Sequence, residues 1–159
     1  FEGEGTLTYP DPQALEATFS YEVRFRASEA LNLPGSGAFW VSPWFPAPLR
    51  LAAIAREVVD KSPATDSTCS GGTLVERYDL KLPAGMQILS MPDGAHVESP
   101  SARYDSRYRL DEQHHLSAER SYVDLSEGPI CPASAVTAWR VALAPMWKDL
   151  RQQLLYRQP

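Results

Sequence analysis

Apolar and polar side chains alternate along several stretches of the chain, and this alternation predicts β-strands. Residues 17–27 show it most clearly, because large apolar side chains there are separated by single polar or charged ones. The apolar face of this stretch carries Phe19, Tyr21, Val23 and Phe25. Successive side chains of a strand point to opposite faces, so this period indicates a strand with one solvated side. Residues 73–82 repeat the pattern, with Glu76 as the polar exception on the apolar side.

A hairpin is predicted further along the chain. Residues 102–110 and 116–125 both alternate, and the polar loop 111–115 between them has a suitable length for a hairpin connection. In the first of these strands the side chains expected to point inward are Tyr104, Tyr108 and Leu110. His114 and His115 fall in or beside the loop, where neighbouring side chains point to opposite faces and do not readily bind one metal ion together.

Two shorter stretches complete the predicted strands. Residues 86–91 form a brief apolar run that a Pro-Asp-Gly turn ends, and residues 5–9 are a weaker candidate near the start. Residues 33–48 fit neither the strand nor the helix period and are rich in Pro, Gly and aromatic residues. For that reason we expect an ordered loop there.

Two segments have helical periodicity instead. Residues 48–60 place Leu and Val side chains on one stripe and begin with a proline, which suits the first turn of a helix. Residues 132–157 carry a longer stripe. Its members recur at steps of three and four and are Val136, Trp139, Leu143, Trp147, Leu150 and Leu154. Pro145 interrupts this helix, so we expect a kink or break around residues 141–144.

These elements predict a mainly β, α+β fold. We expect an antiparallel β-sandwich-like domain with a short crossover helix and a long C-terminal helix. The length of 159 residues, 43% of them hydrophobic, favours a single domain over residues 1–159. The chain starts at Phe1 without an initiator Met, so we expect it to be a C-terminal piece of a larger protein.

The charge and hydropathy of the chain argue against nucleic acid and membranes as partners. The net charge is −5 and the basic residues are scattered, so nucleic acid is not expected to bind. No stretch is apolar for long enough to insert into a membrane, and the start lacks the pattern of a signal peptide. Nothing in the sequence indicates a cofactor or a metal site.

Glu76 needs a partner if it lies on the apolar face of its strand. An unpaired carboxylate is costly to bury, and Arg120 on a later strand is the candidate cation. We expect a structural ion pair between them and not an acid catalyst; alternatively, the two residues mark the place where the inner face meets water.

One cluster of aromatic residues is a candidate binding surface. Phe39, Trp40, Trp44 and Phe45 lie close together in a proline-rich segment. Three interpretations remain open: the cluster caps the core, docks a neighbouring domain, or stacks against a ligand such as a sugar ring.

Several segments together resemble one family. Residues 77–92 read Arg-Tyr-Asp-Leu-Lys-Leu-Pro-Ala-Gly-Met-Gln-Ile-Leu-Ser-Met-Pro, and residues 104–110 read Tyr-Asp-Ser-Arg-Tyr-Arg-Leu. Residues 128–132, Gly-Pro-Ile-Cys-Pro, open a helix that closes with residues 150–156, and residues 30–37 read Ala-Leu-Asn-Leu-Pro-Gly-Ser-Gly. Across nearly its whole length the chain resembles the C-terminal β domain of bacterial envelope proteins in which a domain of unknown function precedes a transglutaminase-like, papain-fold domain.

The resemblance implies an accessory role. A domain of this kind is not catalytic; it stabilises or orients the upstream transglutaminase-like domain, or contributes to the wall of its substrate cleft. The parent protein would be a transglutaminase-like or cysteine-peptidase-like enzyme of the periplasm or cell envelope, and the partners would be the upstream domains of the same chain. A different interpretation is an independent binding module that recognises cell-wall glycan or another envelope protein through Trp40 and Trp44.

The two cysteines fit this setting as a disulfide. In an exported protein, a bond between Cys69 and Cys131 would close a loop of about sixty residues and stabilise the fold by about 4 kcal/mol in the chain-entropy model. Two alternatives remain open, namely two unpaired thiols and a nucleophilic Cys69. The second requires an activating histidine, and no histidine of this chain lies in a motif that places it beside a cysteine. We therefore assign no catalytic residue.

Overall fold

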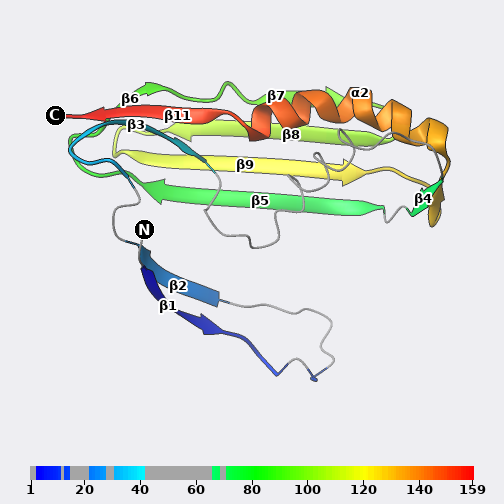
Figure 1. The fold of residues 1–159 in the computed structure, drawn as a ribbon, viewed down its shortest axis with the longest axis horizontal. Coiled ribbons are helices and arrows are strands. Elements are labelled where there is room, and N and C mark those ends of the chain that lie inside the picture. The colour runs from blue at the N-terminus through cyan, green and yellow to red at the C-terminus, as the bar shows by residue number, and fades with distance from the viewer. Residues whose placement is uncertain (1–2, 12, 15–21, 28–30, 42–65, 69–70) are drawn as a thin grey trace.

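The computed structural model describes residues 3–11, 13–14, 22–27, 31–41, 66–68 and 71–159. In chain order the elements are β1 (Gly3–Thr8), β2 (Glu22–Ala27), β3 (Gly35–Trp40), β4 (Ser67–Thr68), β5 (Gly72–Lys81), β6 (Gln87–Ser90), β7 (Ala95–Glu98), β8 (Ala102–Leu110), β9 (His115–Asp124), β10 (Ile130–Cys131), α2 (Ala133–Leu150) and β11 (Gln153–Gln158). Figure 1 shows their arrangement.

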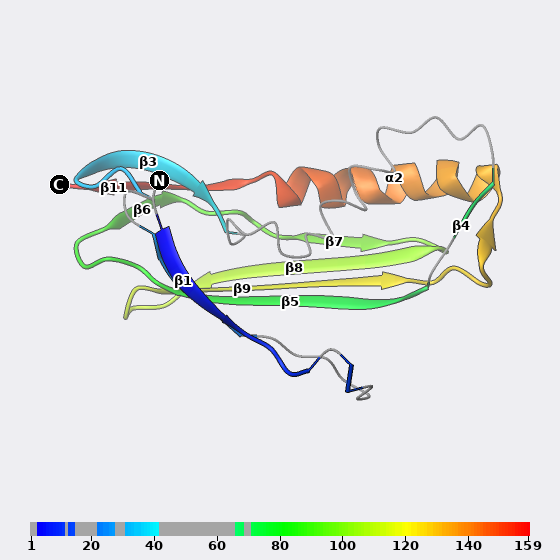
Figure 2. The same ribbon diagram turned by 60° about the horizontal axis from the view of Figure 1, so that its bottom comes forward.

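Two layers make up the body of the molecule. One layer is an antiparallel sheet with the strand order β5-β9-β8-β7. The other layer is half helix and half sheet, because α2 runs directly into β11, the central strand of the sheet β3-β11-β6 (Figure 2). The inner face of the four-stranded sheet is therefore covered by a helix at one end and by strands at the other.

Each half of the second layer has its own hydrophobic core against the four-stranded sheet. Beneath α2 the buried residues are Ala102, Tyr104, Tyr122, Cys131, Met146 and Leu150. Beneath the three-stranded sheet they are Phe39, Val41, Leu82, Met86, Tyr108, Leu116, Ala118, Leu154 and Tyr156. Burial of these side chains is the main favourable contribution to the fold.

The predicted fold class is confirmed, as are the strands on which it depended. The alternation of residues 73–82 corresponds to β5, and residues 102–110 and 116–125 form the antiparallel hairpin β8–β9. Residues 86–91 contain β6, and residues 5–9 overlap β1. In β8 the side chains of Tyr104 and Tyr108 are buried as predicted, but Leu110 is 37% exposed because it stands at the end of the hairpin.

The predicted C-terminal helix is too long by about two turns. It ends at Leu150, and the chain then forms β11, which pairs with β3 and β6 on its two sides. Leu154 fits a helical stripe after Trp147 and Leu150, but it fits a strand equally well together with buried Tyr156. The hydrogen-bonding partners on both sides of β11 decide between the two, and residue periodicity does not reveal them.

Pro145 does not end the helix. The helix is continuous through this residue from Ala133 to Leu150, so the expected break does not occur. The expected bend stays a prediction.

The predicted loop of residues 33–48 contains a strand, β3. Its sequence, Gly-Ser-Gly-Ala-Phe-Trp, has a low intrinsic preference for strands because of its glycines. The strand is stabilised by its hydrogen bonds to β11. Gly37 is directly paired with Tyr156 of β11 and leaves room for the tyrosine ring. A Cβ atom on Gly37 would lie 2.5 Å from the Tyr156 hydroxyl, so only glycine fits without a shift.

Some predictions lie outside the described residues. These are the short helix of residues 48–60, the first part of the strand at residues 17–27, and the side chains of Trp44, Phe45 and Cys69. The described part of the chain contains no helix that is both long and apolar enough to span a membrane.

Candidate functional site

A buried ion pair lies on the inner face of the four-stranded sheet. Glu76 on β5 and Arg120 on β9 are directly paired residues, and Arg120 Nη1 lies 3.6 Å from Glu76 Oε2. The side chain of Arg120 is 1% exposed and that of Glu76 is 13% exposed. The predicted structural ion pair is confirmed. Arg120 also lies over the rings of Tyr78 and Tyr108, at 5.8 and 5.5 Å from their centroids, where the negative faces of the rings favour a cation.

The ion pair continues into a hydrogen-bonded network that reaches the helix. Arg120 Nε donates to the Tyr108 hydroxyl at 3.0 Å, and that hydroxyl donates to Asp149 Oδ2 at 3.0 Å. Tyr104 donates to the same carboxylate oxygen at 2.6 Å. Asp149 is 1% exposed and stands in the last turn of α2, beside the point where the second layer changes from helix to sheet. We call Glu76, Tyr104, Tyr108, Arg120 and Asp149 the buried network.

The tyrosines of this network are held in their neutral form. Burial is the main cause that raises the pKa of Tyr104, and the bonded Asp149 carboxylate adds to it. Burial also raises the pKa of Tyr108 to about 12, although Arg120 opposes the shift. Both hydroxyls therefore remain hydrogen-bond donors at neutral pH and do not act as bases. Because the network is enclosed between the two layers, it has the properties of a structural element and not of a substrate site.

Asp149 was not predicted from the sequence. The sequence indicates such a residue only through Tyr104 and Tyr108, because the hydroxyl of a tyrosine that points inward needs a hydrogen-bonding partner. The helix offers that partner, but the sequence does not show which helical residue meets which strand.

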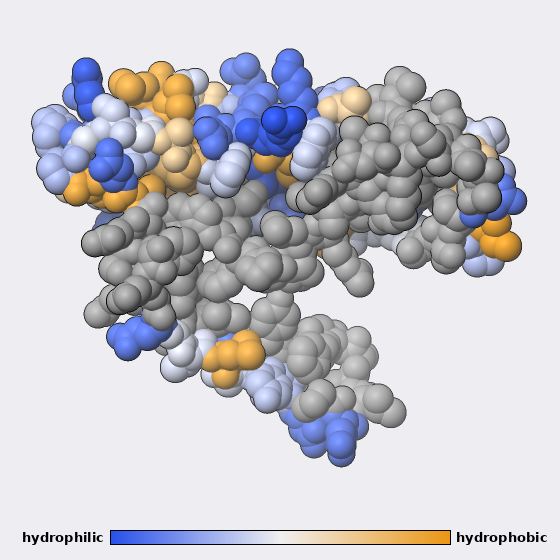
Figure 3. Space-filling view, viewed as in Figure 1, coloured by the Kyte–Doolittle hydropathy of each residue, from blue (hydrophilic) through white to orange (hydrophobic). Residues whose placement is uncertain are grey.

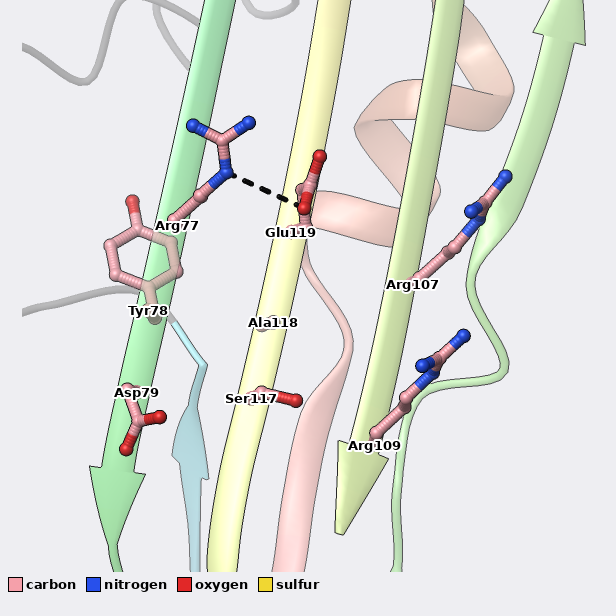
Figure 4. Close-up of a pocket in the computed structure, with 8 residues that line it drawn as sticks. All are labelled: Arg77, Tyr78, Asp79, Arg107, Arg109, Ser117, Ala118 and Glu119. Atoms are coloured by element: carbon pink, nitrogen blue, oxygen red, sulfur yellow. Dashed lines mark ion pairs between the residues drawn. The ribbon is translucent and has the colours of Figure 1, made fainter.

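The opposite, solvent-facing side of the same sheet has a hollow of about 470 Å³. Figure 4 shows the residues that line it, which are Arg77, Tyr78, Asp79, Arg107, Arg109, Ser117, Ala118 and Glu119. They come from three neighbouring strands: β5 on one side, β9 in the centre and β8 on the other. The central strand contributes the short, exposed side chain of Ser117, whereas the side chain of the neighbouring Ala118 faces the core. Long side chains stand on both flanks. We call this feature the arginine hollow.

The charges around the hollow are only partly paired. Arg77 Nε lies 3.5 Å from Glu119 Oε2. Elsewhere on the same face Arg103 Nε lies 3.3 Å from Glu98 Oε1. Arg107 and Arg109 form no ion pair with any carboxylate of the described residues.

A pair formed by a histidine and an aspartate lies on the same face. His96 Nδ1 and Asp105 Oδ1 are 2.7 Å apart, and both side chains are well exposed. The hydrogen bond with Asp105 raises the pKa of the imidazole of His96. His114, in contrast, lies in the β8–β9 turn as predicted, and it has a positive φ of 62°, which is uncommon for a residue other than glycine. Among the described residues, no three His, Cys, Asp or Glu side chains are grouped so as to hold a metal ion.

Strand β3 places the first two residues of the aromatic cluster on opposite faces. Phe39 is 6% exposed and packs in the core, with its ring centroid 5.9 Å from that of Tyr156. Trp40, the next residue of β3, is 49% exposed on the outer face of the three-stranded sheet. Leu155 of β11 and Leu89 of β6 are also exposed, at 43% and 56%. We call Trp40, Leu89 and Leu155 the apolar face; Figure 3 shows apolar side chains gathered at this end of the molecule.

Comparison with known proteins shows a likeness of fold. No protein-family model matches the chain, and no curated protein matches it. A solved structure described as a "putative protease" from Parabacteroides distasonis matches with a TM-score of 0.56 and 11% sequence identity. The match covers 77% of this chain and 23% of that chain. The chain thus spans about a quarter of the length of that protein, and at this identity the likeness concerns the fold alone.

Proposed function

We propose that this chain is a non-catalytic accessory domain that stabilises or orients an upstream transglutaminase-like domain, or helps to shape that domain's substrate cleft. The observation that carries the proposal is the apolar face, where Trp40 is 49% exposed and Leu155 and Leu89 are exposed around it. Large apolar side chains that gather on one surface favour contact with another protein surface. The likeness to part of a much longer protein supports a role within a larger chain.

The buried network supports the non-catalytic part of the proposal. Glu76 pairs with Arg120, Asp149 accepts hydrogen bonds from two tyrosine hydroxyls, and both Arg120 and Asp149 are 1% exposed. A catalytic acid or base has to reach a substrate, directly or through one water molecule. These groups stabilise the domain from within.

The contact is tested by removing the apolar face while keeping the strands. We expect the double variant Trp40→Thr/Leu155→Thr to change the melting temperature of the isolated chain by less than about 2 °C, because both side chains are exposed and threonine favours strands. In the parent protein, we expect the same variant to separate the unfolding of this domain from that of its neighbour. Differential scanning calorimetry of the parent protein measures this as one transition that becomes two.

The matched control is Val75→Thr. Val75 is 41% exposed but stands on the other sheet, β5, away from the apolar face. If this control separates the transitions equally, or if the double variant leaves a single transition, the apolar face is not the contact.

A second candidate function is an independent binding module for cell-wall glycan or another envelope protein, using Trp40 and Trp44. The half-exposed ring of Trp40 favours it, because an open indole stacks against sugar rings. Soluble glycan fragments that change the tryptophan fluorescence of the isolated chain, and fail to do so in Trp40→Thr, would support this module over the accessory domain.

We further propose a periplasmic or envelope location and a disulfide between Cys69 and Cys131. Three observations support the bond. Cys131 is buried at 4% exposure, and the described residues include no free cysteine. In addition, β4 pairs antiparallel with β10 so that Cys131 lies opposite Ser67, and the strand that precedes Cys69 therefore runs beside Cys131.

A thiol count tests the disulfide. We expect the denatured, unreduced protein to show no free thiol and to gain about two mass units on reduction, because one disulfide takes up two hydrogens. Intact-mass spectrometry before and after reduction measures both values. Two free thiols in protein prepared under oxidising conditions would contradict the bond and weaken the proposed location.

A further inference from the structure

The arginine hollow presents two cations at a regular spacing. Arg107 and Arg109 are alternate residues of β8, so both side chains leave the same face of the sheet. Their Cα atoms are about 7 Å apart, as are alternate residues of any extended chain. Figure 4 shows both guanidinium groups directed the same way, away from the central strand.

The surroundings leave these two arginines available to a ligand. Arg103, on the same strand and face, has Glu98 as its partner, and Arg77 has Glu119. Arg107 is directly paired in the sheet with Glu119, and Arg109 with Ser117. Glu119 is thus flanked by two arginines and makes its ion pair with Arg77. The small side chain of Ser117 leaves space beside Arg109, and this space is part of the hollow.

We propose that the arginine hollow binds an extended acidic peptide segment, with carboxylates at alternate positions of the segment paired to Arg107 and Arg109. The guanidinium group matches a carboxylate with two parallel hydrogen bonds, and the spacing of the two groups matches alternate side chains of an extended peptide. Asp79 and Glu119 also line the hollow and repel a continuous polyanion. A peptide in which acidic residues are separated by uncharged or basic ones avoids this repulsion.

The arginine hollow and the apolar face are separate surfaces of the molecule. The arginine hollow lies on the outer face of β5, β9 and β8, whereas the apolar face lies on β3, β6 and β11. Failure of one proposal therefore leaves the other standing.

The experiment titrates the isotopically labelled chain with the blocked peptide Thr-Glu-Thr-Glu-Thr and follows amide and arginine Nε resonances. We expect shifts at Arg107, Arg109 and Ser117. Arg107→Gln and Arg109→Gln are each expected to weaken binding about fivefold, as for the loss of one exposed charge pair. The matched control, Arg103→Gln, removes the same charge from the same strand and face and is expected to weaken binding less than about twofold, because Arg103 is engaged with Glu98.

Three outcomes overturn the proposal. The first is the absence of shifts at the hollow. The second is an equal loss of affinity in Arg103→Gln, which would show diffuse attraction to a charged surface. The third is equally strong binding of inorganic phosphate, or of a peptide with two adjacent glutamates, because either result would show that the spacing of alternate carboxylates is not recognised.

Discussion

Replacing Arg120 with methionine is expected to lower the free energy of unfolding by about 3–5 kcal/mol, because one partner of a buried ion pair is removed. Methionine keeps most of the volume of the side chain, so the loss comes from polar groups and not from a cavity. The Glu76 carboxylate would be left without its cation, and the hydroxyl of Tyr108 would lose the hydrogen bond from Arg120 Nε. Chemical denaturation followed by circular dichroism measures the change.

Two further variants make this result specific. Arg77→Met removes an arginine from the opposite face of the sheet, where the Arg77 side chain is 71% exposed, and is expected to cost less than about 1 kcal/mol. The double variant Glu76→Leu/Arg120→Met removes both charges and is expected to recover much of the stability that Arg120→Met loses. Equal costs for Arg77→Met and Arg120→Met would show that the buried network does not stabilise the fold as we describe.

The position of the buried network explains why a polar group is kept in the core. The second layer changes from α2 to β11 over two residues, and Asp149 lies immediately before this change. Hydrogen bonds from Tyr104 and Tyr108 bind Asp149 to the four-stranded sheet. An apolar contact would allow the end of the helix to slide, whereas these directional bonds fix where the helix ends and where the strand begins.

The sequence predicts this fold best where a strand has one solvated face. In β5, β8 and β9 most inward side chains have polar outward neighbours, so the local period of two predicts the strands. The same reasoning found the pair of Glu76 and Arg120, because a carboxylate on an apolar face requires a cation. These are properties of single strands or of neighbouring strands in a sheet.

The sequence predicts the fold poorly where the partner is distant. β3 has a glycine-rich sequence that becomes a strand only beside β11, whose Tyr156 fills the space above Gly37. Likewise, Asp149 and the arginine hollow depend on which elements meet in three dimensions. The division of Phe39 from Trp40 follows from β3 as well, since adjacent residues of a strand face opposite sides.

Strand β11 is the part of the chain that sequence periodicity assigned wrongly to a helix. We expect Tyr156→Ala to lower the free energy of unfolding by about 3–5 kcal/mol, since the aromatic ring is 2% exposed in the core. The neighbouring variant Leu155→Ala is expected to cost less than about 1 kcal/mol, because Leu155 is 43% exposed on the outer face of β11. Denaturant unfolding of the two variants, side by side, measures the contrast.

This contrast separates the strand from the helix that the sequence suggested. In a continued helix the apolar stripe through Trp147, Leu150 and Leu154 turns Tyr156 away from the core, so its truncation would cost little. In the strand, Tyr156 is buried and its hydroxyl accepts the backbone N–H of Asn32 at 2.9 Å. The hydroxyl also donates to the Asn32 carbonyl oxygen at 3.4 Å. Tyr156→Phe removes these two bonds and is expected to cost about 1 kcal/mol. Similar small effects in Tyr156→Ala and Leu155→Ala would contradict β11 and favour the continued helix.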